Sequence, residues 1–355
     1  MFGTWWRRSK QAPMPPAPRI SSMSLESGAI WARQAVHRRR RTSVGLDLGG
    51  YRLDSLLGRG GMGEVYQATH RLLQRRVAIK VVRPEALIGV QDDEVFLTLR
   101  RFQREARVTA SLRSPHAVDL YDFGMTSDGT LYIVMELLAG LDLERLVDRF
   151  GPLPPDRACH FLQQAMAALE EMHGLGLVHR DIKPANLHVS EDAPCPDFLK
   201  VTDLGLVKPP HGATAEHRVM HAKGRILGTP AYIAPETALG EPGDTRTDIY
   251  SLGCVAYWLL TGRTVFEADS VHQMVWHHVQ DEPIPPSQRT EIPVPAALEQ
   301  LILSCLEKEP HRRPQSIHLL SCRLAECAPP RAWTPEHAKW WWRMHAPGER
   351  PAIAV

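Results

Sequence analysis

The sequence lacks an apolar run long enough to cross a bilayer. A membrane-spanning helix needs roughly 18 or more such residues, and the longest apolar stretch, around Ile249–Leu260, is shorter and is broken by a serine and a glycine. The arginine pair at 7–8 is followed by prolines between 11 and 18, where an export signal would need an apolar segment. The sequence therefore predicts a cytoplasmic protein with no integral membrane segment.

Cysteine patterns that would indicate a metal or redox site are missing as well. The six cysteines form no CxxC pair and no cysteine–histidine spacing typical of a zinc finger. Free thiols in a reducing compartment are the favoured interpretation, with a zinc site as the alternative. The Gly-Lys-Ser or Gly-Lys-Thr end of a P-loop is also absent, which excludes that class of nucleotide-binding protein.

Outside its N-terminal part, the chain has no surplus of positive charge. Residues 1–50 contain nine Lys or Arg and two Asp or Glu, whereas the remainder is net acidic. We therefore expect no nucleic-acid partner for the folded body. Residues 1–48, with several prolines and the arginine run 38–41, are predicted to form a disordered basic tail. Docking to an acidic partner is the alternative for this run.

The hydrophobic pattern changes at Tyr51. Short strand-like stretches follow at 51–57, 64–68, 76–82, 117–123 and 131–136, interrupted by one helical stretch at 94–112. Beyond residue 141 a helical period dominates, with an apolar stripe at Phe161, Ala165, Leu169 and Met172. The predicted fold class is α+β, with a small β-rich lobe at 49–136, a hinge near 136–140 and a larger, mainly helical lobe at 141–328.

Residues 329–355 form a tryptophan-rich C-terminal tail, with Trp333 and the run Trp340–Trp342. Three adjacent indoles are too apolar to remain fully exposed. We expect a helix packed on the large lobe, and the alternative is a membrane-interface or partner site.

Glycines at the first, third and sixth positions of the stretch 58–63 allow a tight turn and a close approach to phosphates. Dinucleotide-binding folds share this spacing, but there a helix follows the glycines. Here the strand-like stretch 64–68 follows, which favours a β-hairpin above the phosphates.

A lysine and a glutamate are expected to form an ion pair near this hairpin. Lys80 lies in the β-branched stretch 77–82, where alternation places it on one face with Ala78 and Val82. Glu105 shares a helical stripe with apolar residues, and a buried carboxylate needs a partner. Glu94 is the competing carboxylate, but it lies near the start of the helix, where the helix dipole would stabilise its charge without Lys80.

The stretch 179–186 reads His-Arg-Asp-Ile-Lys-Pro-Ala-Asn. It resembles the catalytic loop of Hanks-type protein kinases, and the whole motif set resembles their bacterial serine/threonine branch from about Tyr51 to Arg323. The resemblance implies a bilobal protein-kinase fold. It also makes Asp181 the base that orients the substrate hydroxyl, Lys183 a contact to the γ-phosphate, and Asn186 a ligand of Mg²⁺ or Mn²⁺.

The metal-binding triplet of that family follows the catalytic loop. A literal Asp-Phe-Gly at 122–124 precedes the loop and is predicted to be a decoy in a small-lobe strand. We assign the triplet to Asp203, Leu204 and Gly205. The leucine departs from the usual phenylalanine but keeps an apolar side chain, so activity is expected to survive.

The stretch 228–236 resembles the end of a kinase activation segment. The resemblance makes Thr229 a residue that contacts the catalytic Asp and Lys, and it pairs Glu236 with Arg313. Asp248 resembles the buried aspartate that braces the catalytic loop.

The resemblance also implies that ATP binds between the lobes, with Met135 as gatekeeper and the adenine against the hinge backbone. The implied nucleotide contacts are Leu57, Gly58, Arg59, Gly60, Gly61, Met62, Gly63, Val65, Ala78, Lys80, Met135, Glu136, Leu138 and Leu187.

The predicted function is transfer of the γ-phosphoryl group of ATP to Ser or Thr of protein substrates, including the chain itself. Thr214 is the phosphorylatable residue between Gly205 and Gly228, and basic side chains surround it in sequence. Three alternatives are a pseudokinase, a kinase of small molecules and a purely structural protein. The intact polar positions argue against the first and third, and the stretch 229–236 argues against the second.

Overall fold

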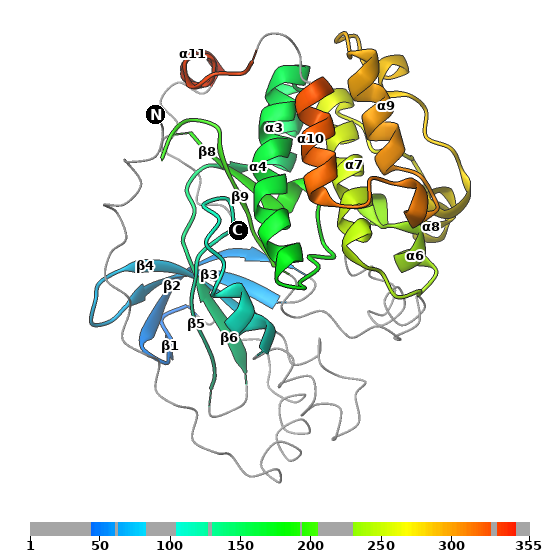
Figure 1. Ribbon diagram of the computed structural model, residues 1–355. Helices are drawn as coiled ribbons and strands as arrows, with labels where there is room; N and C mark the ends of the chain where they lie inside the picture. Colours follow the sequence, from blue (N-terminus) through cyan, green and yellow to red (C-terminus); the bar gives the residue numbers. More distant parts are fainter. Residues whose placement is uncertain are drawn as a thin grey trace.

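The structure, a computed structural model, describes residues 44–60, 63–82, 104–126, 130–191, 194–204, 230–327 and 332–345. These residues form a strand-rich lobe and a helical lobe, joined through residues 136–140 (Figure 1). The predicted α+β class with two lobes is thereby confirmed. The first 43 residues, and with them most of the predicted basic tail, lie outside the described part of the chain.

The small lobe is built on an antiparallel sheet with the strand order β1-β2-β3-β4-β6-β5. Its strands are β1 (Asp47–Leu48), β2 (Tyr51–Arg59), β3 (Gly63–His70), β4 (Arg76–Val82), β5 (Leu120–Met125) and β6 (Leu131–Met135). β1 pairs with β2, so the predicted boundary at 48/49 falls inside this first hairpin. β5 begins later than the predicted residue 117 because Ala117 and Val118 pack in the core of the large lobe.

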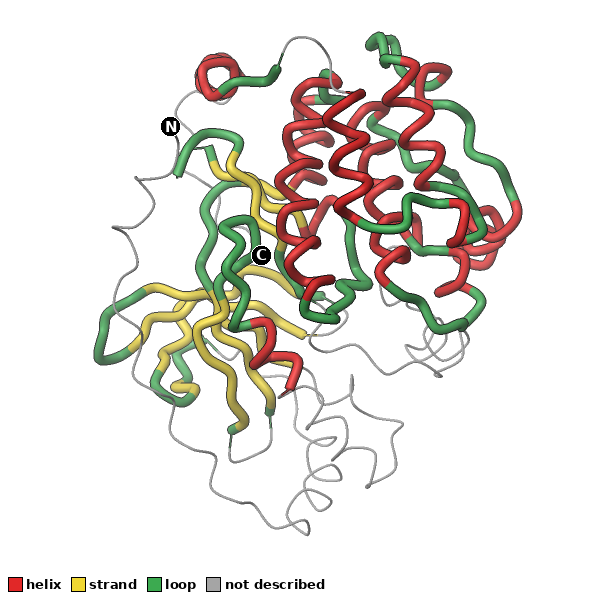
Figure 2. Tube along the Cα trace, viewed as in Figure 1, coloured by secondary structure: helices red, strands yellow, loops and turns green. Residues whose placement is uncertain are grey.

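The two faces of β4 have different neighbours, as alternation requires. Val77 and Ile79 pack in one small-lobe cluster, whereas Val82 packs with Ala106 in another. Ala106 belongs to a helical segment, residues 104–109, which covers this second face of the sheet (Figure 2). The segment is the described end of the helix predicted at 94–112.

The large lobe is mainly helical. Its α-helices are α3 (Leu143–Phe150), α4 (Pro155–Gly174), α6 (Pro235–Ala238), α7 (Thr245–Thr261), α8 (Val271–Gln280), α9 (Ala296–Cys305), α10 (Ile317–Cys327) and α11 (Pro335–His345). Short 3-10 turns are η2 (Pro184–Asn186), η3 (Pro230–Tyr232), η4 (Pro286–Gln288) and η5 (Pro310–Arg312). The predicted apolar stripe on α4 is buried throughout, and α7 is buried on nearly all sides.

A second antiparallel sheet, β7-β8-β9, lies where the two lobes meet (Figure 1). Its strands are β7 (Leu141–Asp142), β8 (Leu187–Ser190) and β9 (Phe198–Val201). Leu187 and Val189 on β8, with Leu199 and Val201 on β9, all pack in the large-lobe core. This sheet therefore fixes the segments that immediately precede β8 and follow β9.

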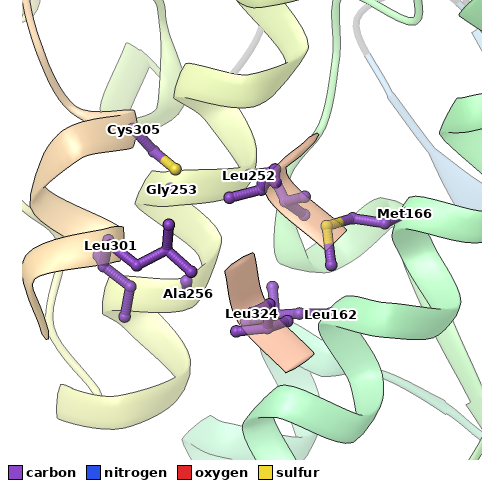
Figure 3. A pocket seen from close by; sticks show the side chains of 10 residues that line it. Leu162, Met166, Leu252, Gly253, Ala256, Leu301, Cys305 and Leu324 are labelled. Carbon is purple, nitrogen blue, oxygen red and sulfur yellow. The ribbon is translucent and has the colours of Figure 1, made fainter. Parts of the chain in front are cut away.

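The helices α4, α7, α9 and α10 enclose a small apolar cavity (Figure 3). It measures about 20 Å³ and is lined by side chains such as Leu162, Met166 and Leu301, with Gly253 in its wall. A water molecule there would lack polar partners, so we expect the cavity to be dry.

The tryptophan-rich tail forms α11, which packs on the large lobe as predicted. Trp342 is buried in the large-lobe core cluster and Trp341 packs against it, whereas Trp340 is 56% exposed. In the described ranges, no helix combines the length and apolar character of a membrane span.

Candidate functional site

The Lys80–Asp203 ion pair connects the two lobes. The Lys80 Nζ atom on β4 lies 2.7 Å from Asp203 Oδ1, which follows β9. Burial alone would raise the pKa of Asp203, but the Lys80 ammonium outweighs it and holds this pKa below its usual range. The site therefore presents an ionised carboxylate beside a fixed cation.

The face of the small-lobe sheet that carries Lys80 forms one wall of the site. Val65 pairs directly with Lys80, and Met135 pairs with Ala78, so their side chains share one face. Because Lys80 reaches the large lobe from this face, the predicted contacts Val65, Ala78 and Met135 border the same space between the lobes.

The described part of the glycine-rich stretch forms the predicted β-hairpin. Gly58 and Arg59 end β2, and the Gly60 amide donates to Gly63 O at 2.9 Å. Leu57 lies at an irregularity in the β2–β3 register. A β-carbon on Gly63 would overlap Val81 O, so this glycine is required by strand packing and not only by a ligand. Gly61 and Met62 lie outside the described residues.

Asp181 lies in the loop between α4 and β8, close to the other expected catalytic side chains. Asn186 Nδ2 donates to Asp181 Oδ2 at 2.9 Å and to its backbone oxygen at 2.7 Å. Lys183 Nζ lies 3.4 Å from Asp181 Oδ2, and the Asp181 side chain is 24% exposed. The carboxylate is thus held in place from within its own loop and remains accessible.

Asp248, on α7, braces the backbone of this loop, as the resemblance implied. It is fully buried and accepts the backbone N–H groups of His179 and Arg180, each at 2.8 Å. His173 Nε2 is a third partner at 2.8 Å, which the motif analysis did not include. Burial favours a raised pKa, but these partners together hold the pKa of Asp248 below its usual range.

The loop and the triplet both contain strained backbone. Arg180 and Asp203 have φ values of +62° and +55°, which non-glycine residues rarely adopt. The contacts of Asp248 and Lys80 hold these conformations in place. Leu204 packs in the large-lobe core, in agreement with the expected role of an apolar residue in the triplet.

The literal Asp-Phe-Gly lies on β5, at a distance from this cluster in the fold. Asp122 pairs with Val134 of β6, inside the small-lobe sheet. A β-carbon on Gly124 would overlap the Tyr132 ring, which explains the glycine without a ligand. The decoy interpretation agrees with this placement.

The hinge rests on the β7-β8-β9 sheet. Glu136 Oε2 lies 2.6 Å from Lys200 Nζ of β9, and Leu138 packs against the large-lobe core. Leu187 is 1% exposed within that core, whereas alternation places His188 on the opposite face, with Lys200. His188 lies beside the hinge backbone at Ala139, so it is a residue near the expected adenine site that motif spacing missed.

Glu105 lies on the helical segment 104–109, beside the buried Ala106, and is itself partly buried. This placement agrees with the inward stripe predicted for the helix. The Lys80–Glu105 ion pair stays a prediction.

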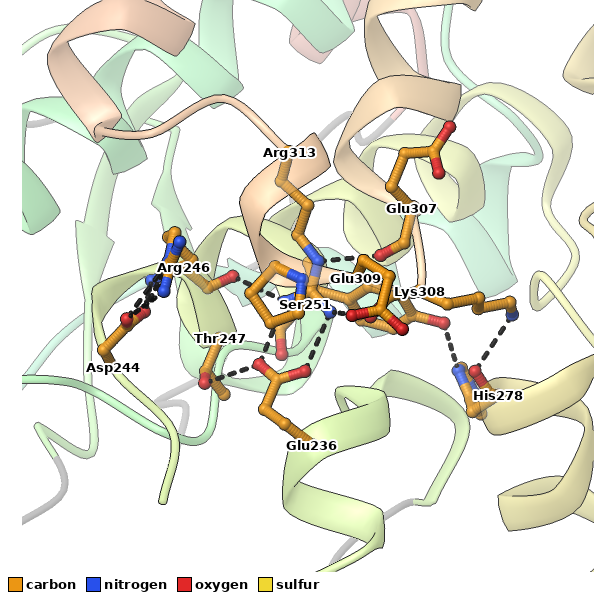
Figure 4. A network of polar contacts seen from close by, with 12 residues as sticks. Glu236, Asp244, Arg246, Thr247, Ser251, His278, Glu307, Lys308, Glu309 and Arg313 are labelled. Atoms are coloured by element: carbon orange, nitrogen blue, oxygen red, sulfur yellow. Dashed lines mark hydrogen bonds and ion pairs between the residues drawn. The ribbon is translucent and has the colours of Figure 1, made fainter. Parts of the chain in front are cut away.

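The pair between Glu236 and Arg313 is present and bidentate (Figure 4). The two nitrogens of Arg313 donate to the two Glu236 oxygens at 2.9 and 2.8 Å, and Thr247 adds a third bond. Burial would raise the pKa of Glu236, but Arg313 outweighs it and lowers this pKa. The pair joins α6 to the segment after η5. Thr229, Thr214 and Gly205 lie outside the described residues.

The donor set of the site suits a hard divalent cation and phosphates. Asp203 offers carboxylate oxygens and Asn186 an amide oxygen, with the Lys80 ammonium nearby. Three-residue metal clusters are absent from the part of the chain described here.

The sequence matches the protein kinase domain family over residues 51–324. The chain belongs to this family. The resemblance to bacterial serine/threonine kinases is also confirmed by relatives. The kinase domain is 38% identical to serine/threonine-protein kinase pkn3 of Myxococcus xanthus, covering 77% of this chain and 49% of the relative. It is 40% identical to serine/threonine-protein kinase PknB of Mycobacterium leprae, covering 75% and 41%.

A solved structure of Rad53 1–466 in complex with AMP-PNP resembles the kinase domain with a TM-score of 0.61 and 25% identity. The likeness covers 77% of this chain and 64% of that one. The chain spans less than half the length of the two curated relatives. Protein kinases as a family use ATP and a divalent metal.

Proposed function

We propose that this kinase domain transfers the γ-phosphoryl group of ATP to serine and threonine hydroxyls of proteins. The observation that carries the proposal is the Lys80–Asp203 contact of 2.7 Å, which brings the small lobe's cation to the expected metal ligand of the large lobe. The neighbouring Asp181 and Lys183 support a hydroxyl acceptor of the serine/threonine class.

In the proposed mechanism, Lys80 orients the phosphates and Glu105 fixes Lys80 from the helical segment. Asp203 and Asn186 would hold Mg²⁺, which supplies charge neutralisation on the phosphates. Asp181 aligns the substrate hydroxyl and accepts its proton at a carboxylate oxygen. Asp248 keeps the Asp181 loop in its strained conformation, so that the catalytic geometry exists before substrate binds. The adenine would lie between the Val65–Ala78 face and the hinge.

The test is transfer of labelled phosphate from MgATP to a generic basic protein, followed by phosphoamino-acid analysis. We expect phosphoserine or phosphothreonine, reduced at least about a hundredfold in Asp181→Asn. Lys80→Met should lose activity too while retaining the wild-type melting temperature within a few degrees. Equal transfer by wild type and Asp181→Asn would refute the mechanism. ATP binding without any transfer would favour a pseudokinase.

We propose in addition that the chain phosphorylates itself at Thr214. The support is the basic sequence surroundings of this threonine and the position of Arg180 next to Asp181. Mapping of phosphosites after incubation with MgATP should find Thr214 occupied in wild type and empty in Asp181→Asn. Phosphate only at other positions would contradict the assignment.

A further inference from the structure

A buried cluster of charged and aromatic residues joins the C-terminal tail to the large lobe. Asp197 and Arg157 are both fully buried, and Arg157 binds Asp197 in a bidentate manner with two bonds of 2.8 Å. Trp333 Nε1 donates to Asp197 Oδ2 at 2.8 Å and Trp342 Nε1 to Oδ1 at 2.7 Å. Each oxygen of a single carboxylate thus accepts one bond from Arg157 and one from the tail.

The cluster is built from segments that are far apart in the sequence. Arg157 is in the first turn of α4, Asp197 directly precedes β9, and both tryptophans lie beyond residue 324, where the family match ends. The Trp341 ring covers the Arg157 guanidinium, with 3.7 Å between Cζ and the ring centroid. The tail therefore lies outside the family match, yet it completes a buried ionic site of the kinase domain.

Asp197 belongs to the hairpin that carries the expected metal ligands. Its backbone N–H donates to Ser190 O at 3.0 Å and it has a φ of +59°, so it shapes the connection from β8 to β9. At the opposite end of the same two strands, the Thr202 N–H donates to Asn186 O at 2.9 Å, and Asp203 follows. One end of the hairpin is held by the tail, and the other end holds Asn186 and Asp203.

We propose that Asp197 is a positioning residue for the metal-binding end of the β8–β9 hairpin, and that Trp333 and Trp342 of the tail hold it there. The proposal rests on the proposed function, which makes Asn186 and Asp203 the metal ligands. Loss of the two indole donors leaves the Asp197 carboxylate short of hydrogen bonds, and the hairpin opens more often.

The first readout needs neither metal nor nucleotide. Hydrogen exchange of the hairpin amides, including Thr202, is measured on the full chain as wild type, Trp333→Phe/Trp342→Phe, Asp197→Asn and Trp340→Phe. Phenylalanine keeps most of the packing and removes the N–H donor, and asparagine tolerates the left-handed backbone conformation. We expect exchange about two- to thirtyfold faster in the first two variants. The exposed Trp340→Phe is the matched control and should equal wild type.

The second readout is the Mg²⁺ concentration that gives half-maximal binding of a fluorescent ATP analogue. We expect it to rise about two- to tenfold in Trp333→Phe/Trp342→Phe and Asp197→Asn, with nucleotide binding at saturating Mg²⁺ nearly unchanged. Lower melting temperatures with unchanged hairpin exchange and unchanged Mg²⁺ dependence would overturn the proposal and make the tail structural only. If wild type binds MgATP but transfers no phosphate, the proposed function fails, and these binding and exchange measurements still decide this inference.

Discussion

Among its described residues, the large lobe contains two buried arginine–carboxylate pairs, and the arginines of the two pairs have different additional partners. Arg313 donates all its N–H groups, to Glu236 and to the backbone oxygens of Glu307, Arg246 and Lys308. Arg157 donates to Asp197 through two nitrogens, and its third has no hydrogen-bond partner among the described residues. A tryptophan ring covers that guanidinium instead. Backbone oxygens of the family domain complete the hydrogen bonds of the first arginine, whereas an aromatic ring of the tail covers the second.

The two carboxylates differ in how many hydrogen-bond donors each keeps when its arginine is removed. Without Arg313, Glu236 keeps one side-chain donor, the Thr247 hydroxyl. Without Arg157, Asp197 keeps two indole donors. A buried carboxylate destabilises the folded state less when more donors remain. Replacing the arginine should therefore lower the free energy of unfolding by different amounts in the two pairs.

The largest effect is expected for Arg313→Met, which leaves Glu236 buried and short of partners. We expect the free energy of unfolding to fall by about 3–5 kcal/mol. Urea denaturation followed by circular dichroism measures it. A loss below about 1 kcal/mol would show that the pair is not the clamp between α6 and the segment after η5.

Arg157→Met should cost less, about 2–3 kcal/mol, because the indole donors still solvate Asp197. Combining it with Trp333→Phe/Trp342→Phe should add more than the separate losses, since the same carboxylate then loses all four side-chain bonds. A cost equal to that of Arg313→Met would contradict the comparison.

The two pairs also show what the sequence could and could not predict. Glu236 and Arg313 both lie in stretches that resemble kinase motifs, so their contact followed from the resemblance. Asp197 lies in a hairpin connection and its tryptophan partners lie outside the family match, so no spacing linked them. The strands β2 to β6 and the helices α4 and α7 followed from the apolar pattern, whereas β1, β7, β8 and β9 were not predicted. His173 and His188 carry no local pattern that distinguishes them from other histidines.

His188 extends the comparison to a buried group that can gain a proton. Burial lowers its pKa to about 4, although the nearby Ala139 backbone acts in the opposite direction. The unfolded chain, with a histidine pKa near 6.5, then binds a proton that the folded state rejects, so stability falls as the pH drops from about 6.5 toward 4.

On this account, wild type should lose on the order of 2 kcal/mol more than His188→Leu between pH 7 and pH 5. Urea denaturation at the two pH values measures the difference. Parallel losses in the two proteins would show that His188 titrates normally in the folded state.

The smallest effect is expected for the exposed pair Arg246–Asp244, with atoms 2.7 Å apart and side chains 28% and 52% exposed. Arg246→Ala should change the free energy of unfolding by less than about 0.5 kcal/mol, because water screens the pair. It also leaves the backbone oxygen that Arg313 uses. A loss above about 2 kcal/mol would mean that the number of hydrogen-bond partners does not predict how much each substitution lowers the free energy of unfolding.

We propose that Asp203 is the metal-binding aspartate and that the literal Asp-Phe-Gly on β5 is structural. The most direct test compares phosphate transfer from MgATP by wild type, Asp203→Asn and Asp122→Asn. The account predicts a loss of at least about a hundredfold in Asp203→Asn, because the carboxylate beside Lys80 is removed, and near wild-type transfer in Asp122→Asn. Transfer that survives Asp203→Asn but is abolished by Asp122→Asn, in folded protein, would contradict it.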